Sequence, residues 1–272
     1  MPLNPIPQTL RLEMNRKHRK ERKKQVRAVT NPKNPEVKYR RELNALVNRL
    51  KRDTEALIIP LLKALQAEYV NDAYAKTLEE AFTRMANAYI NIGRQANIVA
   101  SSFVNNSNQT NKQRFYSAME EAVGVNVQSI VQNENLEDIL VASTRQNVAL
   151  IKSIPEEYFK KIESIVFTGT TQGRNAQSMI KEIQKLNNST TKRAKLIARD
   201  QSSKLNSALN QQRQQNLGVE EYIWRTAGDE RVRDSHASKN GKIYRWDSPP
   251  ADTGHPGEDI QCRCVAQPII KI

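Results

Sequence analysis

The sequence predicts an α+β protein, in which a helix-rich amino-terminal and middle region precedes a small carboxy-terminal domain of short strands. From residue 41 onward, apolar residues recur at three- and four-residue spacing, which is typical of amphipathic helices. After Gly218 the chain changes to short β-compatible runs that are separated by turn-forming residues. A run of helices followed by a few strands favours the α+β class.

We expect three regions along the 272 residues. Residues 1–40 are interpreted as a basic, extended arm, because prolines flank a run of cations with too few apolar residues to form a core. Residues 41–142 are expected to form a helical domain. Residues 143–272 are expected to form a second domain, whose strands and loops begin at residue 219.

The helical pattern begins with the stripe Leu43, Leu46, Val47 and Leu50 and continues beyond Pro60. A proline inside a helix removes a hydrogen bond, so the pattern predicts a kink or a division there. Long helices are expected from residue 61 to 154, broken at the polar tract 101–111, where asparagines replace the apolar stripe.

A second helical group is expected after Pro155, with a turn at 167–173 and two further helices at 176–186 and 194–209. The glycines of the turn also suit a phosphate-binding loop, but the Gly-Lys-Ser/Thr sequence of a P-loop is missing. This favours a turn and a helix cap. Strands are predicted at 221–226, 242–246 and 262–270.

The chain is strongly basic, with 43 Lys and Arg against 29 Asp and Glu and a formal net charge of +14. Such an excess favours a polyanionic partner, either nucleic acid or an acidic protein surface. No stretch approaches the roughly 20 consecutive apolar residues of a spanning helix, and the amino terminus lacks the apolar core of a signal peptide. We therefore expect a protein that stays in the cytoplasm where it is made, without a membrane partner.

The arm carries eight cations in twelve residues, beside Glu21 as their one acidic neighbour. Because no aromatic residues are interleaved to stack on bases, we expect non-specific, electrostatic binding of double-stranded DNA. The alternative is a solvated, flexible tail. The candidate DNA-binding residues are Arg16, Lys17, Arg19, Lys20, Arg22, Lys23, Lys24 and Arg27.

The last fifty residues contain two of the three histidines and both cysteines. Zinc accepts sulfur and imidazole nitrogen in tetrahedral sets, so His236, His255, Cys262 and Cys264 would form a closed, structural zinc site. Cysteines at i and i+2 lie on the same side of an extended segment, and are too close in sequence for an unstrained disulfide. The alternative is that the cysteines are small buried hydrophobes and the histidines bond to loop carbonyls or carboxylates.

A carboxylate and a histidine, Asp229 and His236, also occur close together and can in principle do acid–base work. The alternative is an ion-paired turn in which the neighbouring arginines bond to carbonyls or carboxylates. No nucleophile or second catalytic carboxylate is placed by the spacing, and Ser235 beside His236 does not make a triad. We therefore expect no catalytic residues.

Three stretches of the carboxy-terminal region carry a resemblance: Tyr-Ile-Trp-Arg-Thr-Ala-Gly-Asp-Glu-Arg-Val-Arg-Asp-Ser-His (222–236), Asn-Gly-Lys-Ile-Tyr (240–244) and Gly-His-Pro-Gly-Glu-Asp-Ile-Gln-Cys-Arg-Cys (254–264). Over residues 145–268 the chain resembles the phage minor head proteins, the family of the phage Mu F protein and the SPP1 head morphogenesis protein. The matching positions are Trp224, Asp229, Arg231, Arg233, His236, Gly241, Pro256, Cys262, Arg263 and Cys264. Where the family often has Arg-Thr-Glu, this chain has Arg199, Asp200 and Gln201.

The resemblance implies a structural minor head (capsid) protein of a tailed phage. It implies association with the portal protein and with the major capsid or scaffolding protein, and a place in the virion after assembly in the host cytoplasm. The implied role is head morphogenesis, genome packaging or DNA delivery. The alternatives are a metal-dependent nuclease or other enzyme acting on nucleic acid, and a plain DNA-binding protein without a head role.

Overall fold

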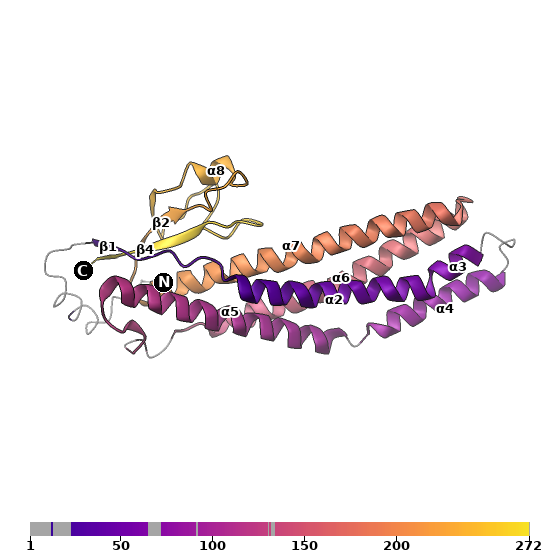
Figure 1. Cartoon of the computed structure of the whole chain (residues 1–272), viewed down its shortest axis with the longest axis horizontal. Helices are drawn as coiled ribbons and strands as arrows, with labels where there is room; N and C mark the ends of the chain where they lie inside the picture. The colour runs from indigo at the N-terminus through magenta and orange to yellow at the C-terminus, as the bar shows by residue number, and fades with distance from the viewer. Residues whose placement is uncertain are drawn as a thin grey trace. The chain divides into compact units, whose positions relative to one another are not determined.

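The computed structural model describes residues 12, 23–64, 72–90, 92–129, 131 and 134–271. Within them it confirms the predicted α+β class, because long helices are followed by a small antiparallel sheet (Figure 1). The helices are α2 (Lys33–Leu57), α3 (Ile59–Ala64), α4 (Asp72–Ala88), α5 (Ile92–Val123), α6 (Glu137–Thr171), α7 (Ala176–Asn216) and α8 (Asp234–Ala237), with a 3-10 turn at Val127–Ser129. The strands are β1 (Lys23–Gln25), β2 (Glu221–Arg225), β3 (Ile243–Arg245) and β4 (Val265–Lys271).

The described residues fall into two compact units, each assembled from segments that are distant in the sequence. The sheet unit comprises the described residues of 1–36, 103–143 and 199–272, and the helical unit comprises those of 37–102 and 144–198. The boundaries at residues 41 and 143 stay a prediction. Of the helices in the described ranges, none has the length and apolar character needed to cross a bilayer.

Buried polar side chains join the helices of the helical unit. Tyr39 of α2 donates to the Asn147 side chain of α6 at 2.8 Å, and both are almost fully buried. Tyr158 of α6 lies 3.1 Å from the Thr54 hydroxyl and 2.6 Å from the Asn187 side-chain oxygen. These bonds satisfy groups that would be costly to bury alone, so they select one alignment of the helices.

Several helix boundaries differ from the prediction. The division near Pro60 is confirmed, because α2 ends at Leu57 and α3 begins at Ile59. However, α2 already begins at Lys33, and α7 is one continuous helix from Ala176 to Asn216. Pro155 lies inside α6, where it and Ile154 are buried, so their packing outweighs the lost backbone bond.

The expected turn at 167–173 lies mostly in the last turn of α6, which ends at Thr171. Gly173 has a φ of 64°, a left-handed conformation that suits glycine, and Arg174 N donates to Gly169 O at 2.8 Å. The Asn175 side chain then accepts from Ser178 N at 2.8 Å, as an N-cap does. The segment is therefore a helix stop followed by a helix start, but the turn is shorter than predicted because residues 167–171 belong to α6.

The sheet has the order β1-β4-β2-β3, and every pairing is antiparallel. Strands β2 and β3 lie where they were predicted, whereas β4 begins at Val265, after the cysteines. Strand β1 was not predicted; it pairs Lys24 with Ile270, so the early and last parts of the described chain are neighbours (Figure 1). Its short, basic sequence has no alternating apolar pattern, so the sequence alone did not indicate a strand.

Residues 26–32 follow β1 and hold to the sheet unit by apolar and polar contacts. Val26 and Val29 are buried in a core cluster with residues of α5 and β4, such as Phe115 and Ile270. The Asn210 side chain donates to Val29 O at 2.9 Å. Of the predicted DNA-binding residues, Arg16, Lys17, Arg19, Lys20 and Arg22 lie outside the described residues, as does the side chain of Lys23.

The polar tract 101–111 was predicted to break a helix, but it lies inside the continuous α5. Asn111 is fully buried and donates to the side-chain oxygens of Asn206 and Asn210 of α7, each at 2.8 Å. The polar side chains thus form a buried hydrogen-bonded seam in place of an apolar stripe. The hydrophobicity pattern of one sequence cannot reveal hydrogen-bond partners that lie about a hundred residues away.

An ion pair completes this seam, and its arginine is buried while its glutamate is partly exposed. Arg213 of α7 is 1% exposed and holds Glu134 through two bonds, Nε–Oε1 at 3.2 Å and Nη2–Oε2 at 3.1 Å. Its guanidinium also donates to the side chains of Asn108 and Asn111. Burial would raise the pKa of Glu134, but the hydrogen bonds and the charge of Arg213 lower it below its ordinary value.

Removing the negative charge of this pair should destabilise the protein more than removing that of an exposed pair. We expect Glu134→Gln to lower the free energy of unfolding at pH 7 by about 2–3 kcal/mol, because the Arg213 guanidinium loses its counter-charge inside the protein. The control is Glu121→Gln, whose pair with Arg27 is exposed and should change stability by less than about 1 kcal/mol. Urea unfolding curves measure both.

The difference in unfolding free energy between the parent and Glu134→Gln should also depend on pH. Because the folded-state pKa of Glu134 is lowered, its stabilisation is complete above the ordinary carboxyl pKa of 4.5 and is lost as pH falls through the folded value. The parent and Glu134→Gln should therefore converge in acid. Equal losses for both variants at pH 7 would contradict the assignment of Arg213 and Glu134 as a stabilising pair.

Candidate functional site

The candidate site is built on the central strand β2, whose Tyr222 and Trp224 side chains are fully buried. Both belong to one apolar cluster with Trp246, Cys262, Cys264 and Ala266. Trp224 N donates to Lys242 O at 2.9 Å and Gly241 N donates to Trp224 O at 2.8 Å, which fastens the turn before β3 to the strand. Gly241 has a φ of 80°, which explains why this turn uses glycine.

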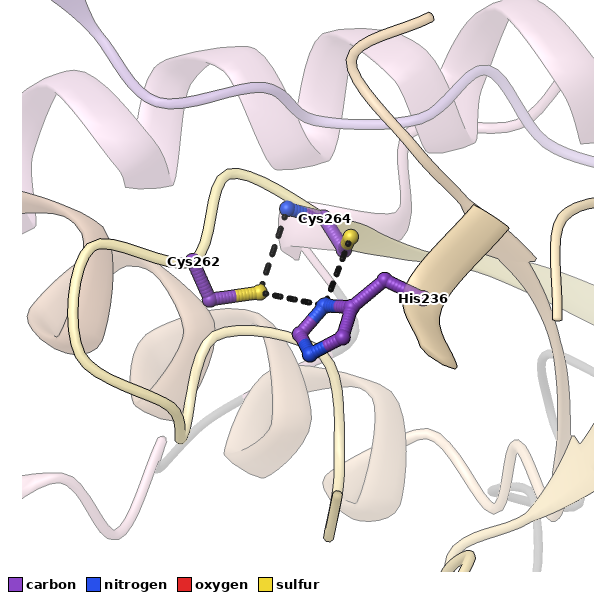
Figure 2. Close-up of side chains that lie close together, drawn as sticks. All are labelled: His236, Cys262 and Cys264. Carbon is purple, nitrogen blue, oxygen red and sulfur yellow. Dashed lines mark hydrogen bonds between the residues drawn. The ribbon is translucent and has the colours of Figure 1, made fainter. Parts of the chain in front are cut away.

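Three of the four predicted zinc ligands lie together. His236 comes from the short helix α8, and Cys262 and Cys264 come from the loop that leads into β4. Their ligand atoms all lie within 4.8 Å of one another, and Nδ1 of His236 is 3.5 Å from Cys262 Sγ and 3.4 Å from Cys264 Sγ. Figure 2 shows the imidazole edge directed at both sulfurs. The three residues are only 3–4% exposed.

The orientation of the His236 ring is fixed from its other side. Nε2 lies 2.8 Å from Oδ2 of Asp259, and Trp224 packs edge-on against the ring with centroids 5.5 Å apart. A carboxylate at Nε2 favours a proton there, which leaves the lone pair of Nδ1 directed at the sulfurs. Asp259 therefore acts through His236. It is a positioning residue that the sequence motif did not reveal.

The two thiols differ in their surroundings. The pKa of Cys262 is lowered by a hydrogen bond from Cys264, and further by the amides of Cys264 and Gly257, whose nitrogens lie 3.4 and 3.3 Å from its sulfur. The pKa of Cys264 is raised, chiefly because it is the protonated partner of Cys262 and is buried. Cys262 is therefore the first of the pair to supply the thiolate that metal binding needs.

The loop that carries these contacts packs closely on α7. Gly257 has a φ of 97°, and a Cβ at this position would meet the Ser207 hydroxyl at 1.8 Å. A glycine is therefore required to bring its amide to the Cys262 sulfur. Pro256 beside it is buried, and the hydroxyl of Ser203 donates to Cys262 O.

His255 was predicted to be the fourth ligand, but it is not part of the three-residue group. Its Nδ1 lies 2.9 Å from the Tyr222 hydroxyl, and its ring packs against Trp246 with centroids 4.8 Å apart. Burial lowers the pKa of His255, which favours the neutral ring. The geometry is that of a buried histidine in an aromatic cluster, because the intervening loop turns its side chain to a different partner.

Asp229 forms the ion-paired turn that was the alternative to acid–base chemistry. Its carboxylate binds both terminal nitrogens of Arg263, one at 2.6 Å, and accepts from Arg231 N at 3.3 Å. The hydrogen bonds from Arg263 lower the pKa of Asp229 to about 2. Arg233 donates to Ile260 O at 2.7 Å. The carboxylate that contacts His236 is Asp259, so the Asp229–His236 pair that acid–base chemistry would need does not form.

A cavity of about 220 Å³ adjoins the three clustered side chains, and they form part of its lining. The remaining lining includes four arginines, of which three are positions of the predicted family motif. They are Arg199, Arg231, Arg233 and Arg263.

Comparison with known proteins confirms the predicted family resemblance. Residues 160–267 match the sequence model of the family described as Phage Mu protein F like protein. A curated relative from Haemophilus influenzae, described as an uncharacterized protein, is 34% identical over 263 residues, which cover 93% of this chain. The chain spans 57% of the length of that relative. No solved structure matches.

Proposed function

We propose that this protein, as a carrier of the phage Mu F-like domain, is a structural minor head protein of a tailed phage. The observation that carries the proposal is the family match over residues 160–267, a span that contains β2, β3 and all three clustered ligand residues. In the proposed role it is assembled in the host cytoplasm, associates with the portal and capsid proteins, and remains in the virion. There it serves head morphogenesis, genome packaging or DNA delivery.

The site supports a structural role over an enzymatic one. Asp229 is held by Arg263, and Asp259 is held at His236, so both carboxylates are engaged in positioning. The three clustered side chains are almost fully buried within the apolar cluster around Trp224. Such an arrangement fits a domain whose surface is presented to assembly partners.

Phage particles provide the direct test. Trp224→Ala removes a fully buried indole and should cost about 3–5 kcal/mol, so particles carrying it should contain less of this protein and lose infectivity. The control is Ile243→Ala on β3, whose side chain is exposed and should be tolerated. Mass spectrometry of purified particles and plaque titres are the measurements.

Two outcomes would move the assignment away from a structural head protein. One is normal incorporation and titre for both Trp224→Ala and Cys262→Ser. The other is metal-dependent cleavage of nucleic acid by the pure protein that His236→Ala abolishes, which would favour a nuclease.

The domain is further proposed to hold one zinc ion through His236, Cys262 and Cys264. Two sulfurs and one imidazole nitrogen are ligands that zinc prefers, and the Asp259 carboxylate at Nε2 is the usual partner of a metal-bound histidine. The indole nitrogen of Trp224 is buried without a hydrogen-bond partner among the described residues, and the Trp224 side chain opposes the rise in the Cys264 pKa. A metal-bound thiolate at Cys264 would satisfy this N–H.

Elemental analysis distinguishes three protein ligands from four. We expect about one equivalent of zinc in the parent protein, less than a tenth in His236→Gln and Cys262→Ser, and an unchanged content in the matched variant His255→Gln. Chelation should lower the melting temperature of the parent and of His255→Gln. Loss of zinc from His255→Gln would restore the four-ligand site, and a metal-free parent would leave the buried-cysteine interpretation.

The basic arm is proposed to bind double-stranded DNA without sequence readout. Its cations are clustered, and two of them, Lys23 and Lys24, belong to β1, which is paired with β4. The arm is thereby attached to the sheet unit, which would place bound DNA next to the head-protein domain.

Neutralising the arm should weaken DNA binding and its salt dependence. We expect a full-length variant with Arg16, Lys17, Arg19, Lys20 and Arg22 changed to glutamine to bind duplex DNA more weakly, and the slope of log K against log salt to fall by up to about 0.9 per lost contact. The charge-matched control changes five exposed helix lysines to glutamine: Lys152, Lys160, Lys161, Lys181 and Lys185. Equal affinities and slopes in the two variants would show that the arm is not the binding element.

A further inference from the structure

The cavity beside the three clustered side chains is strongly basic, because four arginines line it. Its four arginines come from three separate segments: Arg199 from α7, Arg231 and Arg233 from the loop before α8, and Arg263 from the loop before β4. Cations from distant parts of a chain that converge on one concavity are repelled by one another unless anions balance them. The balance of charge in the cavity therefore indicates what it is built to hold.

Two of the arginines have partners. Arg263 is neutralised by the Asp229 carboxylate, which binds both of its terminal nitrogens. Arg233 donates to Ile260 O, and its Nη1 lies 3.7 Å from Oδ2 of Asp259. These contacts hold the guanidiniums of Arg233 and Arg263 in the wall of the cavity.

The side chains of the other two, Arg199 and Arg231, make no hydrogen bond or ion pair with any residue that the structure describes. The acid next to Arg199 is already engaged, because Asp200 accepts from Gln261 N at 2.7 Å and lies 3.0 Å from Lys204 Nζ. Arg199 is also partly buried. A partly desolvated cation without a partner is costly, so an anion in the cavity would be stabilised there.

We propose that this cavity binds a phosphate group, held by the guanidiniums of Arg199 and Arg231. The planar fork of arginine matches phosphate oxygens in pairs, and a concave site lined by low-dielectric walls concentrates the attraction. The cavity is smaller than the roughly 300–1,000 Å³ of typical small-molecule pockets, which favours a single phosphate group over a whole nucleotide. This assignment does not rest on the head-protein role or on the zinc ion.

Calorimetric titration of the full-length protein with inorganic phosphate at constant ionic strength tests the proposal. We expect Arg199→Gln and Arg231→Gln each to weaken phosphate binding roughly tenfold or more, as loss of a charge-assisted hydrogen bond does. The matched control is Arg145→Gln, which removes an exposed arginine of α6 outside the cavity and should bind like the parent. Arg231 is exposed, so its replacement leaves the packing intact even if Arg199→Gln fails to fold.

A second titration with a short DNA duplex identifies the source of the phosphate. It is made in the full-length background with the five arm cations neutralised, so that the arm does not hide the cavity. If Arg231→Gln weakens binding of both ligands, the site takes a phosphate of the DNA backbone; if it weakens only inorganic phosphate, the site takes a free or small phosphorylated anion. The proposal is overturned if phosphate binds equally to the parent, Arg231→Gln and Arg145→Gln, or does not bind the parent at millimolar concentration.

Discussion

The arrangement of the candidate site depends on the register of β4 against β2. Trp224 pairs with Ala266 and Arg225 with Val265, so Cys264, the next residue, is delivered to the end of β2. A slip of one residue would turn every side chain of β4 to the other face and carry Cys264 away from His236. The register is held on both sides, because β1 pairs with the far edge of β4 and β3 with the far edge of β2. The two outer strands are short, but each contributes to the position of the thiols.

Trp224 links the register of the strands to the position of the His236 imidazole. It lies in the strand that pairs with β4, and its ring packs against the His236 imidazole, while Lys239 of the segment after α8 lies 6.0 Å from the indole centroid. The residue thus sets the distance between the sheet and α8, which has only four residues and cannot hold its own position. Asp259 acts from the opposite side of the imidazole. The histidine is therefore clamped between an apolar wall and a carboxylate, and both control where Nδ1 points.

Much of the fold and of the candidate site could be predicted from the sequence, and the features that could not be predicted have identifiable causes. The clustered histidine and cysteines and the strands β2 and β3 are local features, so the sequence alone indicated them. The contacts of Asp259 and His255 could not be predicted, because loops with several turn formers decide which way each side chain faces, and sequence spacing carries no such information. The unbroken α5 was missed for another reason: Asn111 is satisfied by α7, and the sequence pattern treats buried asparagine as a helix breaker. The start of α2 and strand β1 depend on tertiary partners in the same way.

The net charge around the cavity depends on the thiol cluster in only one of the cluster's states. Four guanidiniums line the cavity, and the carboxylates of Asp229 and Asp259 oppose them, which leaves two positive charges in excess. A zinc ion with two thiolates and a neutral imidazole carries no net charge, and neither does the same cluster with both thiols protonated. The excess is therefore the same in these two states, so phosphate affinity should not follow zinc content at a pH below the pKa of Cys262, which is about 6. Only a metal-free cluster with an ionised Cys262 would reduce the positive excess, and it would do so by one charge. This state becomes more populated as pH rises, because Cys262 then loses its proton.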